Sequence, residues 1–469
     1  MEYGKQLTVA TTDIPGLLLL DLPVHGDNRG WFKENWQREK MTAAGLPDLG
    51  PVQNNVSFNA NRGTTRGIHA EPWDKYVSVA TGRIFGAWVD LREGEGFGRV
   101  VTAEIDPSRA VFVPNGVGNA FQTLQDGTAY VYLVNDHWSA EAQSRYTFLN
   151  LADEASGIAW PIPLETAELS AKDREHPRLA DVTPMSRRRV LVTGANGQLG
   201  RALRARVDAL EAIGPVDFVG SSEFDIADPA AYTDRRWQDY AVVVNAAAYT
   251  RVDEAETPQG RRDAWRVNVE GVRLLAETSR AHGIRLVHVS SDYVFDGSAE
   301  THAEDEPFSP LGVYGQTKAA GDALAATVPA HLVLRTSWVI GDGGNFVATM
   351  RSLAERGVDP SVVDDQIGRL TFTDDLADAL VHLLVTDAES GVYNVSNSGE
   401  PLSWAGIAAR VFALTGHDAQ RVSGVGTAEY FAGKAAAPRP LNSTLDLGRL
   451  EASGFHTRDQ LVALESYLS

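Results

Sequence analysis

The 469-residue sequence predicts two domains of different fold class, an all-β domain followed by an α/β domain built on a parallel sheet. Short alternating apolar runs fill the first third of the chain, and a polar segment begins near residue 168. After residue 189, strand signals alternate with helix signals. A chain of this length is too long to fold around one hydrophobic core of ordinary size. We therefore expect one domain over residues 1–183 and a second over residues 187–469.

The first domain is predicted from runs that recur about every 8 to 14 residues between residues 30 and 160, with no amphipathic helix among them. The runs are YVSVATG, RIFGAWVDL, RVVTAEIDPS, AVFVPNG and AYVYLVND. This rhythm is typical of a β-sandwich or small barrel. Its size and the histidine in RGIHAEP suggest a cupin-like jelly roll. Metal-binding cupins need two histidines two residues apart, but Glu71 follows His69, so we expect no metal.

Residues 168–189, ELSAKDREHPRLADVTPMSRRR, are polar and contain proline, and we interpret them as a domain tail plus a linker. The second domain is predicted from the strand runs RRVLVTG, VDFVG, AVVVNAAA, IRLVHVSS and HLVLRTSW. Helices are expected from Gln198, over residues 264–282 and from Tyr314. Such alternation indicates βαβ crossovers in a Rossmann-type sheet, whose ligand lies beyond the carboxyl ends of the strands.

The charge and composition of the chain bear on the partners that it binds and on the cellular compartment that it occupies. A net charge of −20 argues against binding to nucleic acid or to an anionic membrane. The N-terminus lacks the apolar core of a signal peptide, and LLLLDL is too short to span a membrane. The absence of cysteine excludes disulfides, thiolate nucleophiles and cysteine zinc sites, and it fits a cytoplasmic protein.

Three motifs of the second domain meet at the strand ends. Gly194, Gly197 and Gly200 have GxxGxxG spacing between a strand and a helix, which suits a pyrophosphate, although the triplet alone is weak evidence. Ser291 closes another strand, and Tyr314 and Lys318 are four residues apart on one helix face. A lysine one turn away stabilises a phenolate, and a serine hydroxyl holds a carbonyl oxygen. These residues beside a nicotinamide predict a carbonyl reductase.

The second half resembles dTDP-4-dehydrorhamnose reductase, an extended short-chain dehydrogenase/reductase, through GANGQLG, VVNAAAYTRVDEAE, VSSDYVFDG, YGQTKAAGD, RTSWV, DDQIG and PRPLNSTLD. The resemblance implies that Tyr314 is the acid, with Lys318 and Ser291 assisting. Residues implied to contact the cofactor are Gly194, Gly197, Gln198, Leu199, Gly200, Asp225, Ile226, Ala248, Tyr249, Thr250, Tyr314 and Lys318. Ser291, Asp292 and Trp338 are implied to contact the sugar nucleotide.

Two residues depart from this family, and the cofactor is inferred from a third feature. Ser291 stands where threonine is usual, and Leu370 stands where proline is usual. The segment GSSEFD offers no acidic residue directly after the second strand to reject a 2′-phosphate. We therefore expect NADPH as the cofactor, with NADH as the alternative.

The first half resembles dTDP-4-dehydrorhamnose 3,5-epimerase through DNRGWFKE, QNNVSFN, TTRGIHAEP, DKYVSV, AYVYLVND, GIAWP and ELSAKD, in that order. The resemblance implies that His69 is the base, oriented by Asp173, that Lys75 faces the developing oxyanion, and that Tyr132 returns a proton. Residues implied to hold the nucleotide and diphosphate are Arg29, Glu34, Gln53, Asn55, Arg66 and Lys172. Asn119 replaces a histidine usual at this substrate-binding position, and His137 and Trp138 replace a tyrosine pair.

The two resemblances together predict a bifunctional enzyme of dTDP-L-rhamnose synthesis, because the epimerase product is the reductase substrate. The family resemblance also implies a homodimer. One alternative is a 4-ketoreductase for another dTDP-6-deoxyhexose, preceded by epimerisation at C3 alone. A second alternative is a first domain that binds a sugar nucleotide or mediates dimerisation without catalysis, which Asn119 and Trp138 suggest.

Overall fold

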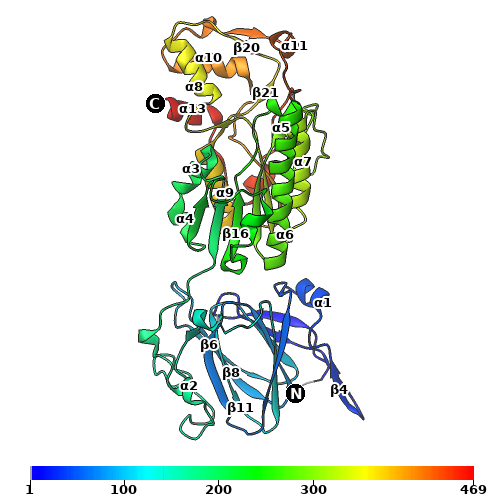
Figure 1. Cartoon of the computed structure of the whole chain (residues 1–469), viewed down its shortest axis with the longest axis vertical. Coiled ribbons are helices and arrows are strands. Elements are labelled where there is room, and N and C mark those ends of the chain that lie inside the picture. The colour runs from blue at the N-terminus through cyan, green and yellow to red at the C-terminus, as the bar shows by residue number, and fades with distance from the viewer. Residues whose placement is uncertain (1–2, 141) are drawn as a thin grey trace. The chain divides into compact units, whose positions relative to one another are not determined.

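The computed structural model describes residues 3–140 and 142–469. The chain divides into two compact units, Met1–Arg187 and Arg188–Ser469 (Figure 1).

The N-terminal unit consists of two antiparallel sheets and a separate hairpin. The larger sheet has the order β1 (Thr8–Thr11), β2 (Leu18–Asp21), β10 (Arg109–Val113), β7 (Lys75–Thr81), β12 (Thr128–Val134) and β5 (Gln53–Asn59). The smaller sheet has the order β13 (Thr147–Phe148), β6 (Thr65–Ala70), β11 (Val117–Thr123), β8 (Ile84–Asp90) and β9 (Val100–Ile105). The hairpin pairs β3 (Val24–Asp27) with β4 (Gly30–Lys33).

The two sheets pack on a shared apolar core. The larger sheet contributes Val77 and Val111, and the smaller contributes Trp88 and Phe121, all buried in one cluster. Alternate residues of a strand point to opposite faces, so the alternating runs of the sequence place one face inward. The predicted all-β jelly-roll class is confirmed. The structure also contains two short helices, α1 (Arg38–Ala43) and α2 (Ala171–Arg174). The first corrects the expectation that no helix interrupts residues 30–160.

The C-terminal unit is built on a six-stranded sheet whose neighbours are all parallel. Its order is β15 (Val216–Val219), β14 (Arg189–Thr193), β16 (Tyr240–Asn245), β17 (Arg285–Ser291), β18 (His331–Thr336) and β23 (Gly391–Val395). These strands are apolar on both faces, as expected for a parallel sheet covered on both sides by helices. The predicted Rossmann-type class is confirmed.

Helices cover both faces of this sheet (Figure 1). One face carries α3 (Gln198–Arg204), α4 (Val207–Glu211) and α9 (Thr373–Val385). The other face carries α6 (Val272–His282) and α7 (Val313–Ala325). Two predicted helices are broken. The helix from Gln198 ends at Arg204 and restarts at Val207, and a π-helix at Arg266–Gly271 separates α5 (Pro258–Trp265) from α6.

A smaller C-terminal layer packs around its own core of Val347, Phe372, Ile407, Val411 and Leu464. Its helices are α8 (Phe346–Glu355), α10 (Trp404–Leu414), α11 (Thr427–Tyr430) and α13 (Gln460–Leu468). Helix α12 (Gly448–Ala452) packs instead through Leu450 on the core of the six-stranded sheet. Its two-stranded pairs are β19 (Val339–Ile340) with β22 (Thr371–Phe372), β20 (Ser361–Val363) with β25 (Ser423–Val425), and β21 (Ile367–Gly368) with β24 (Leu402–Ser403). Among the described residues, no helix has the length and apolar character to cross a membrane.

Candidate active sites

The N-terminal unit contains a pocket of about 640 Å³ between its two sheets. Strand β6 contributes His69 from the smaller sheet, whereas β7 and β12 contribute Lys75 and Tyr132 from the larger one. Helix α2 contributes Asp173. The four residues predicted to be catalytic in this half therefore line one cavity, with the proposed base and acid on opposite sheets.

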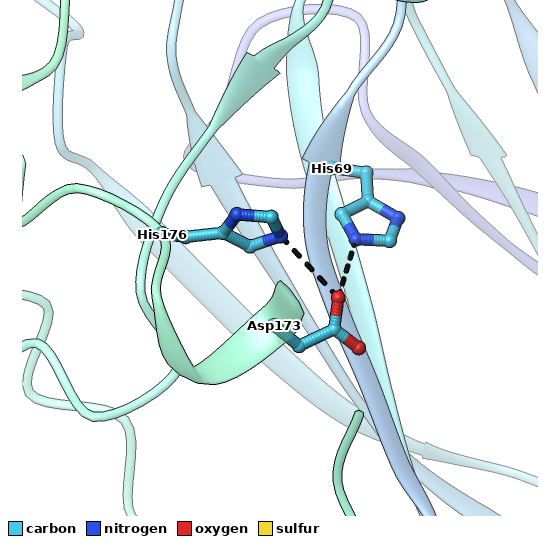
Figure 2. A group of neighbouring side chains, drawn as sticks. All are labelled: His69, Asp173 and His176. Atoms are coloured by element: carbon cyan, nitrogen blue, oxygen red, sulfur yellow. Dashed lines mark hydrogen bonds and ion pairs between the residues drawn. The ribbon is translucent and has the colours of Figure 1, made fainter. Parts of the chain in front are cut away.

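His69 and Asp173 form a hydrogen-bonded pair, and His176 joins them (Figure 2). His69 Nε2 lies 3.0 Å from Asp173 Oδ1, and His176 Nε2 lies 3.3 Å from the same oxygen. Burial opposes ionisation of Asp173, but the contacts with His69 and Ser170 outweigh it and lower the pKa of this carboxyl. A carboxylate accepts, so the hydrogen of His69 lies on Nε2 and its Nδ1 is left with a lone pair.

His176 is a site residue that sequence reasoning missed. Burial lowers its pKa, although the neighbouring Asp173 carboxylate acts in the opposite direction. His69, Asp173 and His176 each offer one atom that could bind a metal ion, and these three atoms lie within 4.8 Å of one another, a spacing that a three-ligand metal site also has. This grouping could not be predicted from the sequence, because His176 stands in a polar segment interpreted as a domain tail plus a linker.

Lys75 is buried beside the ring of Tyr132, with Nζ 5.5 Å from the ring centroid. Burial lowers the pKa of Lys75 to about 7. Its ion pair with the carboxylate of Glu71 acts in the opposite direction, because a nearby anion favours the ammonium. Burial also raises the pKa of Tyr132, which keeps this phenol protonated. The pocket thus places a lysine paired with Glu71 and a proton donor opposite His69.

Asn119 lies at the back of the pocket, where it faces His69 across the β6–β11 pair. Trp88 Nε1 donates to its Oδ1 at 3.0 Å, and its Nδ2 donates to the hydroxyl of Tyr130 at 3.0 Å. Both ends of the amide are therefore already bonded to protein. A neutral amide has taken the place of the imidazole expected here from the family resemblance.

Of the six residues predicted to hold the nucleotide and diphosphate, two line the pocket and four do not. Arg66 and Lys172 line the pocket and bring positive charge to it. Four others do not line it: Gln53 and Asn55 lie on the edge strand β5, and Arg29 and Glu34 lie on or next to the β3–β4 hairpin. The Arg29 side chain is 85% exposed and paired with Asp27. Within one copy of the chain, these four residues stand apart from the base.

In the C-terminal unit, the glycine turn joins β14 to α3. Gly194 adopts φ +67°, and a Cβ there would come within 2.6 Å of the backbone of Ala246 and Ala247. A Cβ at Gly200 would lie 2.4 Å from the carbonyl oxygen of Gly194. Gly197 precedes α3, and no side chain in the described structure caps the helix. This close turn before uncapped N–H groups fits a dinucleotide pyrophosphate. Gln198 and Leu199 begin α3 at the same place.

Ser291, Tyr314 and Lys318 meet beyond the end of β17. The Ser291 hydroxyl donates to Asp292 Oδ1 at 2.9 Å, and Lys318 Nζ donates to the carbonyl oxygen of Val289 at 2.7 Å. Burial lowers the pKa of Lys318 to about 8 and raises the pKa of Tyr314, while contact with Ser291 draws the latter down. Burial raises the pKa of Asp292 to about 6. A protonated phenol, a lysine and a hydroxyl thus share one strand end.

Behind these residues runs a set of buried polar side chains that we call the buried polar row. Thr193 donates to Asn245 Oδ1 at 2.8 Å, and Asn245 Nδ2 lies 3.1 Å from His288 Nδ1. His288 Nε2 lies 3.8 Å from Asp322, which pairs with Arg335 at 3.0 Å. All five side chains are buried. The row crosses β14, β16, β17 and β18 through one residue of α7.

The other predicted cofactor contacts lie along the carboxyl edge of the sheet. Asp225 accepts from Arg266 at 2.9 Å, and Ile226 is buried. Asn268, in the π-helix, accepts from the backbone N–H of Tyr249 at 2.8 Å and donates to Thr317 of α7 at 3.1 Å. Asn268 therefore fixes the segment of Ala248, Tyr249 and Thr250 to the helix that carries Tyr314 and Lys318. Sequence reasoning missed it, although it is a polar residue on the buried side of a helix.

Trp338 follows β18 in a left-handed conformation, with φ 45°. Its ring stacks on Trp404 of α10 with centroids 3.7 Å apart, and a Cβ at Gly368 would come within 2.9 Å of it. Trp404 was not predicted to take part. Leu370, where the family usually has proline, donates its backbone N–H to Gln460 at 3.0 Å, a bond that proline lacks. The loop shape is therefore supported in a different way here.

Fold and sites together define a two-domain enzyme, in which a β-sandwich acid–base domain precedes a short-chain dehydrogenase/reductase domain. Residues 11–181 match the family model described as dTDP-4-dehydrorhamnose 3,5-epimerase, and residues 188–469 match the model described as RmlD substrate binding domain. The chain belongs to the dTDP-4-dehydrorhamnose 3,5-epimerase family through its N-terminal unit and to the RmlD reductase family through its C-terminal unit.

Individual relatives agree with this assignment. The Protein RmlC homolog of Streptococcus pyogenes serotype M6 is 54% identical over 178 residues, which are 37% of this chain and 89% of the relative. The dTDP-4-dehydrorhamnose reductase of Streptomyces griseus is 42% identical over 282 residues, which are 58% of this chain and 90% of the relative. A crystal structure of dTDP-4-dehydrorhamnose reductase from Bacillus anthracis in complex with NADP is 32% identical, with a TM-score of 0.55, covering 60% of this chain and 98% of that one.

Proposed function

We propose that this chain converts dTDP-4-dehydro-6-deoxy-D-glucose into dTDP-L-rhamnose in two steps. The N-terminal unit inverts C3 and C5, and the C-terminal unit reduces the C4 ketone. One observation carries the proposal: the predicted base and acid of the first step line one pocket from opposite sheets, in a chain that continues into a reductase of the same sugar family. A base and an acid on opposite walls suit inversion, which removes a proton from one face and returns it to the other.

In the first step, His69 removes the proton that the C4 ketone has made acidic. Asp173 stabilises the resulting imidazolium through its 3.0 Å contact with Nε2. The Lys75 ammonium stabilises the negative oxygen of the enolate. Electrostatic stabilisation of this kind is usually the largest single contribution to the rate enhancement. Tyr132, kept protonated by burial, then delivers a proton to the opposite face. Arg66 and Lys172 attract the diphosphate of the sugar nucleotide.

In the second step, Tyr314 donates a proton to the C4 oxygen, and Ser291 holds that oxygen by a hydrogen bond. Lys318, one helical turn away, stabilises the phenolate that Tyr314 leaves behind. NADPH, when bound, supplies the two electrons and the hydrogen that C4 gains. The glycine turn at Gly194 and Gly197 would hold its pyrophosphate. The NADP in the related crystal structure supports this cofactor, and NADH is the alternative.

The test is incubation of the purified chain with dTDP-4-dehydro-6-deoxy-D-glucose and NADPH in D₂O, followed by stereochemical analysis of the sugar. We expect dTDP-L-rhamnose with deuterium at both C3 and C5. Deuterium at C3 alone would establish a single epimerisation and a different 6-deoxyhexose. A product with no exchanged hydrogen would mean that the first unit has no catalytic role.

The active form proposed here is a homodimer made through the N-terminal unit. β5 pairs only with β12 in the described structure, and its Val56 and Phe58 side chains are 65% and 66% exposed. Phe32 on the β3–β4 hairpin is similarly exposed. The predicted nucleotide ligands that miss the pocket lie on or beside these same elements, so a second copy seated there would bring them to its own pocket. Sedimentation equilibrium of the chain and of a Phe58→Glu variant tests this: the variant is expected to be monomeric.

We place this enzyme in the cytoplasm. The zero cysteine count fits a reducing compartment, where NADPH is also available.

A further inference from the structure

His176 is the one member of the histidine–aspartate cluster to which the proposed mechanism gives no role. Its Nε2 atom is buried and has no aligned hydrogen bond in the described structure, and it lies 3.3 Å from Asp173 Oδ1, the oxygen that also contacts His69. Figure 2 shows both imidazoles directed at this oxygen from two sides, with the other ring nitrogen of His69 pointing away from it. The arrangement places one carboxylate between two rings.

The ring of His176 is held in place by contacts with an aromatic side chain and by hydrogen bonds to the neighbouring backbone. It stacks on Phe148 with centroids 4.6 Å apart, and the edge of the same Phe148 ring meets His69 at 5.5 Å. The side chain of Asn150 donates to the carbonyl oxygens of Arg174 and His176, each at 2.9 Å. One aromatic side chain therefore contacts both imidazoles, and the backbone on either side of His176 is clamped. The position of its Nε2 relative to Asp173 follows from these contacts.

The protonation states of Asp173, His69 and His176 determine which role His176 can take. Asp173 is ionised at neutral pH, since its pKa is lowered. His176 is neutral, because burial lowers its pKa more than the Asp173 carboxylate raises it, so it does not compete with His69 for the substrate proton. A neutral imidazole nitrogen beside a carboxylate oxygen acts as a donor. A second donor restrains the carboxylate, which a single bond to His69 leaves free to swing on α2, a helix of one turn.

We propose, building on the proposed epimerase function, that His176 is a positioning residue. Its Nε2–H, which has no other partner in the described structure, acts through the 3.3 Å contact to hold the Asp173 carboxylate where that carboxylate fixes the Nε2–H of His69, leaving Nδ1 of His69 as the base. The amide of Asn119 in this pocket is already bonded to Trp88 and Tyr130, so the second imidazole near His69 is that of His176. Hydrogen bonds to charged groups contribute about 1.5–3 kcal/mol, or about tenfold or more in rate.

The experiment compares His176→Phe with His176→Gln in the full chain. Phenylalanine keeps a ring to stack on Phe148 but has no donor, whereas the Nε2 of glutamine reaches about as far as that of histidine. The readout is the rate of deuterium incorporation from D₂O into dTDP-4-dehydro-6-deoxy-D-glucose without NADPH, over a range of substrate concentrations. We expect His176→Phe to lose about tenfold or more in kcat with KM changed less than about twofold. His176→Gln is expected to stay within about threefold of the parent.

Each other result overturns a defined claim. A parent chain that does not exchange overturns the proposed function and this role with it. A parent that exchanges beside an equally fast His176→Phe variant overturns the role of His176 alone. If His176→Gln is as slow as His176→Phe, the ring is needed for its shape and the donor has no part. If a chelator abolishes exchange in the parent and Zn²⁺ restores it, the cluster is a metal site.

Discussion

The pH dependence of the reductase step tests the assignment of Lys318. The side chain is buried, donates to the carbonyl oxygen of Val289, and has its pKa lowered by burial from the ordinary 10.5 to about 8, although Asp322 opposes the effect. The difference corresponds to about 3 kcal/mol of net destabilisation of the ammonium form. Since the ammonium is what stabilises the Tyr314 phenolate, losing its proton removes the assistance.

The direction of the pH effect on the reductase rate follows from the lowered pKa of Lys318. Lys318 is charged below about pH 8 and neutral above it. We therefore expect kcat of the reductase step to be level up to about pH 7, half-maximal near pH 8 and about one tenth of maximal at pH 9. Lys318→Arg gives the matched control, because a guanidinium keeps its charge over this range. Whatever activity this variant retains is expected to be independent of pH up to about 9.

The assay supplies the already epimerised ketosugar and saturating NADPH, so that only reduction is followed, through the loss of nicotinamide absorbance. Buffers of equal ionic strength keep screening constant, since charge interactions weaken with salt. A parent rate that stays level up to about pH 10 would refute the reasoning. So would the same alkaline decline in Lys318→Arg, because the titrating group would then be another residue.

Three further outcomes follow from the site geometry. Substitution of His69→Asn is expected to lower C3 and C5 deuterium exchange by about 10²-fold or more while reduction of the epimerised ketosugar stays at the parent rate; slow reduction as well would indicate misfolding. Tyr314→Phe is expected to slow reduction by about 10²- to 10⁴-fold with NADPH binding, measured by calorimetry, unchanged. Arg335→Met leaves the buried Asp322 unpaired and is expected to cost about 3–5 kcal/mol in urea unfolding of the reductase unit. The double variant Asp322→Leu/Arg335→Met should recover most of that loss, and no recovery would argue against the ion pair as the cause.

The fold classes of both units could be predicted from sequence because they depend on periodicity. Alternating runs specify strands with one buried face, and uniformly apolar runs such as VLVT specify central strands of a parallel sheet. The breaks in the helices could not be predicted. No glycine or proline lies between Arg201 and Leu210, where the first helix breaks. The π-helix at Arg266–Gly271 is identified only when Asn268 is seen to bind the Tyr249 backbone and Thr317.

The sites were predictable to the extent that the sequence carries motifs. Tyr314 and Lys318 are one helical turn apart, so spacing alone places them together. His69 and Asp173 are 104 residues apart, and only the family resemblance indicated their pairing. Nothing indicated His176, since a histidine in a polar, proline-containing segment looks like linker. Its contact with Asp173 depends on how that segment folds back over β13 and β6.

The buried polar row has a consequence for strand alignment. Thr193, Asn245 and His288 occupy register-matched positions on three adjacent strands. A slip of one residue would turn each of them to the opposite face and leave buried donors and acceptors unpaired. Apolar strands rich in valine would tolerate such a slip far better. The row therefore fixes the register of the three strands, and with it the position of the glycine turn after Thr193 relative to Ser291 at the end of β17, so that a nicotinamide and a ketone can meet there.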